Sequence, residues 1–157
     1  MGADMGDSPR EPGRITSYGI ALATFMASAS GAVIAGRRTG AGPERYLPSD
    51  LVIGALATQK FTRMLAKDAV ATPLRAPFTD YEGVAGPAEL NESPKDAHGR
   101  HTLGELLSCP FCLAPWVAGA YVTGLAFAPR AARAWAAVFS LVSVSDTLQH
   151  AYVRLQS

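Results

Sequence analysis

The residues with the most evident chemistry are two cysteines, the only two in the chain, which stand in the sequence Cys109-Pro-Phe-Cys112. Two thiols one helical turn apart can form and break a disulfide when a helix N-terminus stabilises one of them as the thiolate. If one helix continues through this stretch, Glu105, Cys109, Cys112 and Trp116 share a single face of it. A carboxylate, two thiols and an indole on one face predict a polar site that faces the interior of a bundle or a water-filled cleft, not lipid.

The sequence leaves three interpretations of the cysteines open. The first is a membrane thiol–disulfide oxidoreductase with Cys109 and Cys112 as catalytic residues, because no strand precedes the motif as it would in a soluble enzyme of this kind. The second is a zinc site that adds His98 and His101 as ligands. The third, which the sequence favours, is two small side chains packed where helices meet. We therefore predict no cofactor and no metal.

A second group of polar residues stands within apolar segments. Asp146 lies in a long apolar stretch, and an unpaired carboxylate in hydrocarbon costs at least a few kcal/mol, so it requires a partner. Lys60 and Arg63, which share a helix face, are the natural partners, with Asp68 close by in the sequence. The sequence predicts a structural ion-pair network. The alternative is an ion or proton path through Asp146.

Four segments with few charges predict the helices that position these residues. Only 17% of residues are charged, against about 25% in typical soluble domains. The predicted helices cover residues 18–36, 51–67 (with Ser49 as N-cap), 102–128 and 131–155. The first is just long enough to span a bilayer. Its apolar run continues past Ala27-Ser28-Ala29, which resembles a cleavage site, so a retained helix is favoured over a cleaved signal peptide.

These elements predict an all-α, multi-pass membrane bundle of three to four helices with a polar loop between helices two and three. Residues 1–17 are expected to be a disordered tail, and residues 18–157 the membrane helical domain. Within the polar loop, the segment Asp68–Tyr81 is expected to be ordered and residues 86–99 flexible. Whether helix 51–67 spans the membrane or lies on its surface stays open, because only its first half is apolar.

The distribution of basic residues predicts the orientation of such a bundle. If all four helices span, the N-terminal tail, residues 60–101 and the C-terminus share one side, and that side carries more lysine and arginine. The protein is then expected in the inner membrane, with both termini in the cytoplasm. The net charge of +1 gives no general attraction for nucleic acid. The expected partners are the lipid bilayer and another membrane protein or a second copy of the chain.

Four motifs in order give the chain a resemblance to a known family. They are KFTRMLAKD at 60–68, PLRAPFTDY at 73–81, GELLSCPFCLAPW at 104–116 and SDTLQHAY at 145–152. Over about residues 45–157 the chain resembles the bacterial membrane-protein family catalogued as domain of unknown function 1360. The resemblance implies a membrane protein of a Gram-positive bacterium, in a family with some members linked to sporulation and no established biochemical activity.

The resemblance also implies which polar residues matter. Those that match the family's motifs are Lys60, Arg63, Asp68, Arg75, Glu105, Cys109, Cys112, Trp116, Asp146 and Gln149. They come from every predicted element except the first helix, as one convergent site would require. The predicted function is a non-enzymatic membrane scaffold or partner protein, with sporulation or the cell envelope as its context. The alternatives are the thiol–disulfide oxidoreductase and a small transporter subunit with Asp146 on an ion path.

Overall fold

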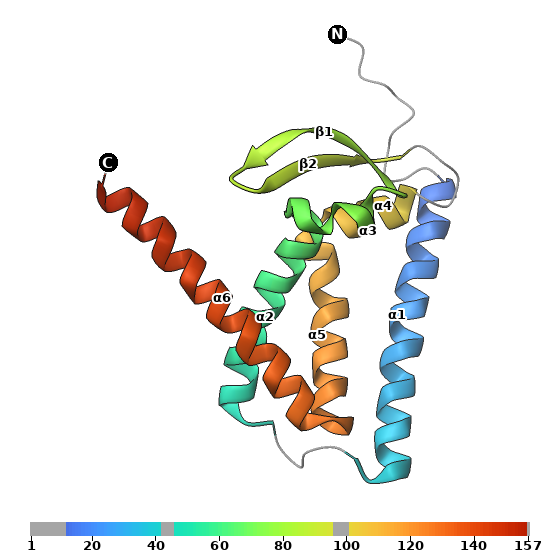
Figure 1. Ribbon diagram of the computed structural model, residues 1–157. Helices are drawn as coiled ribbons and strands as arrows, with labels where there is room; N and C mark the ends of the chain where they lie inside the picture. Colours follow the sequence, from blue (N-terminus) through green and yellow to red (C-terminus); the bar gives the residue numbers. More distant parts are fainter. Residues whose placement is uncertain (1–11, 42–45, 96–100, 157) are drawn as a thin grey trace.

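The computed structural model describes residues 12–41, 46–95 and 101–156, which form helices and one β-hairpin (Figure 1). The elements are α1 Pro12–Thr39, α2 Pro48–Lys67, the 3₁₀ turn η1 Ala69–Ala71, α3 Thr72–Arg75, β1 Thr79–Gly86, β2 Glu89–Pro94, α4 His101–Ser108, α5 Pro110–Phe127 and α6 Pro129–Gln156. The prediction of a helical fold is confirmed. Helix α1 begins at Pro12, inside the segment that the sequence led us to expect as a tail, and residues 1–11 of that segment lie outside the described part of the chain.

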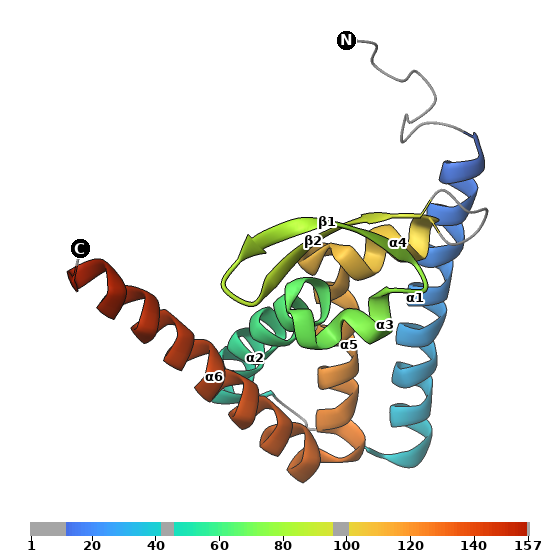
Figure 2. The same cartoon turned by 45° about the horizontal axis from the view of Figure 1, so that its top comes forward.

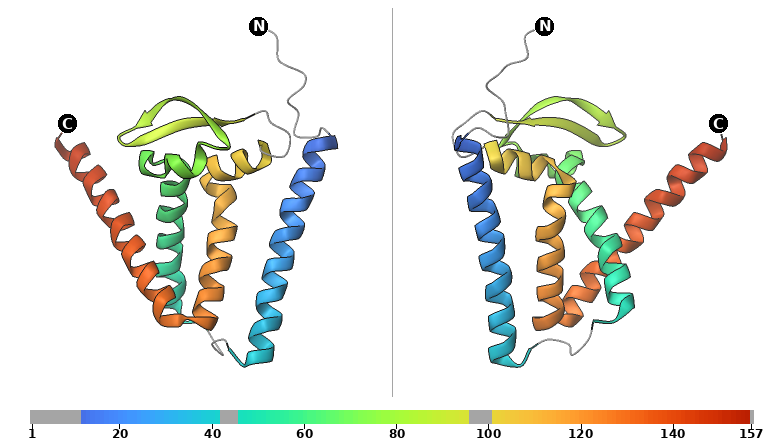
Figure 3. Two further views of the ribbon diagram at one scale, coloured as in Figure 1. Left: turned by 45° about the vertical axis from the view of Figure 1, so that its right-hand side comes forward. Right: turned by 180° about the vertical axis from the view of Figure 1, so that it is seen from behind.

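The four long helices stand between two ends of the molecule (Figures 1 and 3). The start of α1, the end of α6 and the hairpin lie at one end, while the turns after α1 and after α5 lie at the other. Helices α2, α5 and α6 pack against one another, and α1 stands beside α5 with fewer contacts. The C-terminal half of α6 diverges from the other helices. The core helices are thus α2, α5 and α6.

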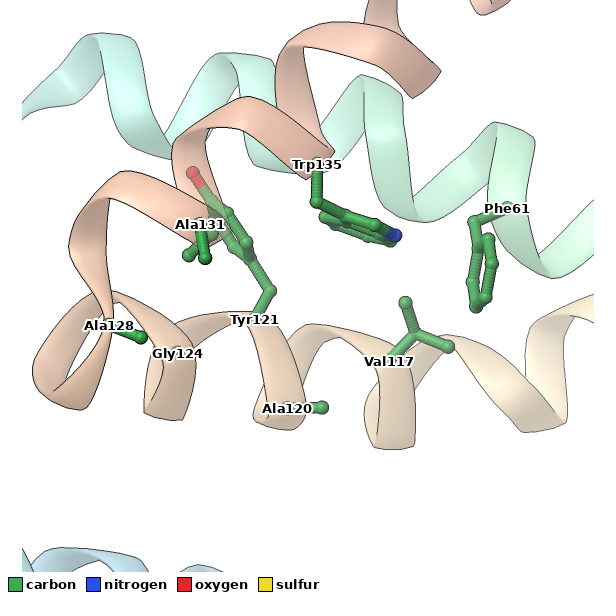
Figure 4. Close-up of a pocket in the computed structure, with 9 residues that line it drawn as sticks. Phe61, Val117, Ala120, Tyr121, Gly124, Ala128, Ala131 and Trp135 are labelled. Carbon is green, nitrogen blue, oxygen red and sulfur yellow. The ribbon is translucent and has the colours of Figure 1, made fainter.

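The core is small and aromatic. Ala57 and Ala136 bring α2 and α6 close together, and Tyr121 of α5 fills the space beside them. Trp135 lies between Tyr121 and Phe61, with ring centroids 5.8 Å and 5.3 Å away, along the edge of a cavity of about 360 Å³ (Figure 4). The Phe61–Trp135 pair is edge-to-face, and such a pair adds about 0.5–1.5 kcal/mol beyond the area that it buries.

One glycine decides how closely α2 approaches α5. A Cβ atom built on Gly54 would lie 2.2 Å from Cε1 of Tyr121, so a residue with any side chain would displace the ring. Tyr121 is held from the other side by its hydroxyl, which donates to the carbonyl oxygen of Asp50 at 3.0 Å. The tyrosine therefore fits only over a helix backbone without a side chain at this position.

A folded cap covers one end of the bundle (Figures 1 and 2). It consists of η1, α3 and the antiparallel hairpin β1–β2, with Thr79 paired to Pro94 at its open end and Gly86 to Glu89 at its turn. The hairpin contacts α4 directly, since a Cβ atom on Gly104 would lie 3.0 Å from Cβ of Pro94 at the end of β2. The expectation that residues 68–81 are ordered is confirmed, and the expectation of a flexible stretch over residues 86–99 is wrong for residues 89–94, which form β2. Residues 96–99 of that stretch lie outside the described part of the chain.

The expected single helix over residues 102–128 is also wrong, because it is two helices. Helix α4 ends at Ser108 and α5 begins at Pro110 in a different direction (Figure 3). Cys109 between them has extended backbone angles, φ −111° and ψ 107°. A proline disfavours the helical conformation in the residue before it, which explains the break. Leu47 rather than Ser49 is the N-cap of α2, because Pro48 takes the first helical position.

Two helices are long and apolar enough to cross a membrane, α1 over Gly13–Thr39 and α5 over Pro110–Phe127. Length and composition alone identify them, and a signal sequence near an N-terminus has the same properties as α1. Helices α2 and α6 do not reach that standard, so the predicted bundle of three to four spanning helices is not confirmed by apolar length.

Candidate functional site

The predicted contact between α2 and α6 exists. Lys60 Nζ lies 2.9 Å from Oδ2 of Asp146 and 3.7 Å from Oδ2 of Asp68. The lysine side chain is mostly buried, at 16% exposed, and Asp146 is about two-fifths exposed. Because Asp68 follows α2 directly and Asp146 comes from α6, this lysine connects the bundle with the start of the cap. The side chain of Asp146 therefore has the cationic partner that its apolar surroundings require.

The most buried charges in the described part of the chain lie inside the cap. Arg75 and Glu92 form a two-bond ion pair, with Nε–Oε2 at 2.8 Å and Nη2–Oε1 at 3.0 Å, and their side chains are 1% and 4% exposed. Nη1 of Arg75 also donates to the carbonyl oxygens of Leu65 and Asp68, and Thr79 donates to Glu92. One arginine thus joins the end of α2, α3 and the hairpin.

This ion pair makes the cap sensitive to acid. The Arg75 guanidinium beside Glu92 holds the pKa of that carboxyl below its usual value of about 4.5, the hydroxyl of Thr79 adds to this effect, and burial opposes it. A carboxyl with a lowered folded pKa contributes stability that is complete above the unfolded pKa and is lost as the pH falls through the folded one. We expect the melting temperature to fall below about pH 4.5, measured by circular dichroism in detergent between pH 7 and pH 3.

The matched variant for this pH experiment is Glu92→Gln. It is expected to melt at a lower temperature at pH 7 and to lose less on acidification than the unchanged chain, because it has no carboxyl to protonate. Parallel curves for the two proteins would show that Glu92 is not the group responsible.

Two further ion pairs join elements that are distant in the sequence. Arg63 of α2 binds Glu89 of β2 through Nε and Nη2, at 2.6 and 2.8 Å, on a partly exposed surface. At the opposite end of the molecule, Arg133 of α6 binds both carboxylate oxygens of Asp50, at 3.0 and 2.8 Å. Arginine–carboxylate pairs with two hydrogen bonds fix orientation as well as distance. They therefore hold the hairpin to α2 and the beginnings of α2 and α6 to each other.

The break at Cys109 gives the cysteines a geometry that one continuous helix would not. Cys109 is the N-cap of α5, and its sulfur accepts a hydrogen bond from the backbone N–H of Cys112 at 3.3 Å. The Cys112 thiol points at the same sulfur, with the two Sγ atoms 2.6 Å apart. Both cysteines are free, Cys109 half-buried and Cys112 exposed. We call this pair the corner dithiol.

Polar residues of α1 contact polar residues of α4, the helix that directly precedes the corner dithiol in the chain. The Tyr18 hydroxyl donates to Glu105 at 2.5 Å, and the same carboxylate lies 3.8 Å from Arg14 and 3.4 Å from His101. Arg14 and His101 also contact each other. Farther along, Phe25 of α1 packs edge-to-face on Trp116 at 5.3 Å. Glu105 and Trp116 thus attach α1 to the rest of the protein.

The predicted site residues do not all converge into one site. The ion pairs join Lys60, Asp68 and Asp146 in one cluster, which Arg75 reaches through the carbonyl oxygen of Asp68. Glu105 pairs with α1 instead. Gln149 forms a hydrogen bond to Ser145 of its own helix, at 3.4 Å. No group of three or more His, Cys, Asp or Glu side chains in the described ranges could hold a metal ion. His98, which the zinc interpretation needs, lies outside those ranges.

Sequence reasoning missed the carboxylates that complete these pairs, Glu89, Glu92 and Asp50. Two of them stand in the stretch that appeared flexible because of its glycines and prolines. The available signal was a hairpin pattern, with Gly-Pro-Ala between TDYEGVA and ELNES. The pairing of Asp50 with Arg133 had no local signal, because 83 residues separate them.

Comparison with known proteins places this architecture in a family. The family model described as "Protein of unknown function (DUF1360)" matches residues 53–152, from within α2 to near the end of α6. The chain is 31% identical over 105 residues to "Sporulation protein YjcA" of Bacillus subtilis (strain 168), a match that covers 62% of this chain and 88% of that protein. No solved structure matches. The chain belongs to the DUF1360 family of proteins of unknown function.

Proposed function

We propose that this chain is a non-enzymatic, multi-pass inner-membrane scaffold protein whose four long helices span the bilayer and whose cap holds a membrane-protein partner. The observation that carries the proposal is the apolar surface of the bundle around a partly polar interior. Among the described residues, the buried set includes Asp50, Thr58, Thr62, Ser140 and Ser143, while large apolar side chains point outward on all four long helices. Water would expel such a surface, whereas lipid solvates it.

Exposed apolar side chains also cover α2 and α6, the two long helices that composition alone does not identify as spanning. On α2 they include Leu51, Val52 and Leu56, and on α6 Val138, Leu141 and Val144. Helix α2 has 20 residues, which correspond to about 30 Å, the thickness of the hydrocarbon core. The basic end of α2 meets carboxylates of the cap and of α6, which removes the electrostatic obstacle to spanning.

The cap supports the partner-binding part of the proposal. Buried and surface ion pairs hold it in one position on the bundle. It nevertheless presents large apolar side chains outward, namely Val70, Leu74, Tyr81 and Val84, which we call the cap surface. Apolar side chains kept exposed on a rigid element are typical of interaction sites. The similarity to a sporulation protein suggests that the partner acts in spore formation.

A transporter subunit remains the less favoured function. An ion path requires a carboxylate that is open to the ion. The carboxylate of Asp146 lies 2.9 Å from the ammonium group of Lys60, which favours a structural role for the pair.

The first test is membrane topology. In a Cys109→Ser/Cys112→Ser background, single cysteines are introduced at Tyr81, Gln156, Thr39 or Arg130, all of which lie at the two ends of the bundle. We expect the first two positions to be protected from an impermeant maleimide in intact cells and the last two to be labelled. Protein that is soluble after cell disruption, or labelling on the same side at all four positions, would refute the four-span arrangement.

The second test addresses the partner. The chain is expressed in sporulating Bacillus subtilis cells that lack their own Sporulation protein YjcA. A photocrosslinking residue at Val84 is expected to join the chain to one membrane protein. Replacing Leu74 and Tyr81 by serine should abolish that product, while a crosslinker at Leu148, which faces outward on α6, should not give it. Crosslinks at Val84 to lipid alone would contradict the proposal, and crosslinks to a second copy would replace the partner by a homo-oligomer.

A further inference from the structure

We propose that the corner dithiol is a thiol–disulfide exchange site, in which Cys109 attacks a disulfide bond of a polypeptide and Cys112 resolves the mixed disulfide. This inference goes beyond the proposed scaffold function, because it adds a redox reaction, one disulfide reduced per chain, to a protein whose scaffold role does not need it. It rests on three observations: the distance between the two sulfurs, the direction of the hydrogen bonds between them, and an exposed aromatic side chain beside them.

The sulfur atoms need little movement to form a bond. They lie 2.6 Å apart, and a disulfide bond is about 2.05 Å long. The extended conformation of Cys109 brings them together, because it turns its side chain over the first turn of α5 toward Cys112. Pro110 enforces that conformation. The arrangement is therefore built by the sequence Cys-Pro-x-Cys at the beginning of a helix.

The hydrogen bonds assign the two roles. Cys109 Sγ accepts from the N–H of Cys112 and from the Cys112 thiol, so both donors point at one sulfur. It is also the N-cap of a helix that has no acidic residue in its first turn. A sulfur in this position is the one better able to carry the negative charge of a thiolate, which is the attacking species. Cys112 keeps its proton until the second step.

The surroundings favour a polypeptide as the substrate. Phe111 lies between the two cysteines on the first turn of α5, at the cap end of the spanning segment, and it is 87% exposed, although an aromatic ring is among the side chains that gain most from burial. Leu103 of α4 is also exposed, at 46%. An apolar peptide segment around a disulfide would cover these side chains, whereas a small hydrophilic disulfide would not.

The exchange balances without another reactant. The Cys109 thiolate attacks one sulfur of the substrate, R–S–S–R′, forming Cys109–S–S–R and releasing R′–S⁻. Cys112 then loses its proton and attacks the Cys109 sulfur, forming the Cys109–Cys112 disulfide and releasing R–S⁻. Two electrons pass from the cysteine pair to the substrate, and the two released thiolates take up the two protons that the cysteines lose.

The test uses the reduced full-length chain in detergent micelles and a peptide closed by one disulfide and rich in apolar residues. We expect the peptide to be reduced once per chain and the protein to lose the mass of two hydrogen atoms without an adduct. Cys112→Ser is expected to stop at a stable mixed disulfide on Cys109. Cys109→Ser is expected to react at about one tenth of the rate or lower, because the remaining thiol lacks the hydrogen-bond donors that point at Cys109.

Controls separate exchange from an inert packed pair. Before the comparison, each variant must unfold at the same temperature as the unchanged chain. Phe111→Ser should slow the reaction with the apolar peptide and leave that with 2-hydroxyethyl disulfide unchanged; equal slowing of both would remove the polypeptide from the proposal. Thiols that react with neither disulfide until the protein is denatured would overturn the exchange site, as would equal rates for Cys109→Ser and Cys112→Ser.

Discussion

The replacement Arg75→Met is expected to destabilise the cap by about 3–5 kcal/mol, the typical result of removing one partner of a buried ion pair. The variant leaves the carboxylate of Glu92 buried without its cation and removes the donor to the carbonyl oxygens of Leu65 and Asp68. Hydrogen exchange of the hairpin amides in detergent micelles measures the effect. We expect faster exchange in β1 and β2, with much less change in α5.

The control for this experiment is Arg63→Met, which breaks the arginine–carboxylate pair between α2 and the hairpin. Arg63 is 51% exposed, so water solvates Glu89 after the change, and a loss of about 0–1 kcal/mol is expected. Both arginines bind one glutamate of β2 through two hydrogen bonds, and burial is the main difference between them. Equal effects of the two replacements would mean that burial of Arg75 does not determine its contribution.

The replacement Gly54→Leu is expected to separate α2 from α5. The first atom of the new side chain would lie 2.2 Å from a ring carbon of Tyr121, and that ring is buried and hydrogen-bonded through its hydroxyl. Overpacking typically costs about 1–3 kcal/mol, and a clash with a fixed ring belongs at the upper end. The free energy of unfolding from a denaturant titration in micelles measures the loss, and quenching of Trp135 by water-soluble acrylamide should increase.

Gly31→Leu is the matched control. No atom lies within 4 Å of the position where its Cβ would be built, and Gly31 lies on the side of α1 that the bundle leaves open. A glycine inside a helix is less favourable than leucine by several tenths of a kcal/mol, so this variant is expected to be neutral or slightly more stable. If Gly54→Leu behaved in the same way, the close approach of α2 and α5 would be refuted.

The sequence was sufficient for the features that depend on neighbouring residues. Apolar segments predict the four long helices, and the cost of an unpaired charge in apolar surroundings predicts the partner of Asp146. The break at Cys109 follows from Pro110, although the sequence led us to expect one helix over residues 102–128. The order of residues 68–81 was expected, but the hairpin was missed because its position depends on Arg75–Glu92 and Arg63–Glu89, contacts between residues 17 and 26 positions apart.

The ion pairs between α2 and α6 also determine where the chain can change in length. The two helices run in the same direction, with Asp50 bound to Arg133 near their beginnings and Lys60 bound to Asp146 farther along (Figure 1). One inserted residue between Asp50 and Lys60 turns everything after it by about 100° around the helix axis, so the second pair could no longer form beside the first. After Asp146, residues 147–156 of α6 are exposed, so this part of the helix has no such constraint. Insertions and deletions in related chains should therefore be excluded from residues 50–60 and 133–146 and be tolerated in the last ten residues of α6.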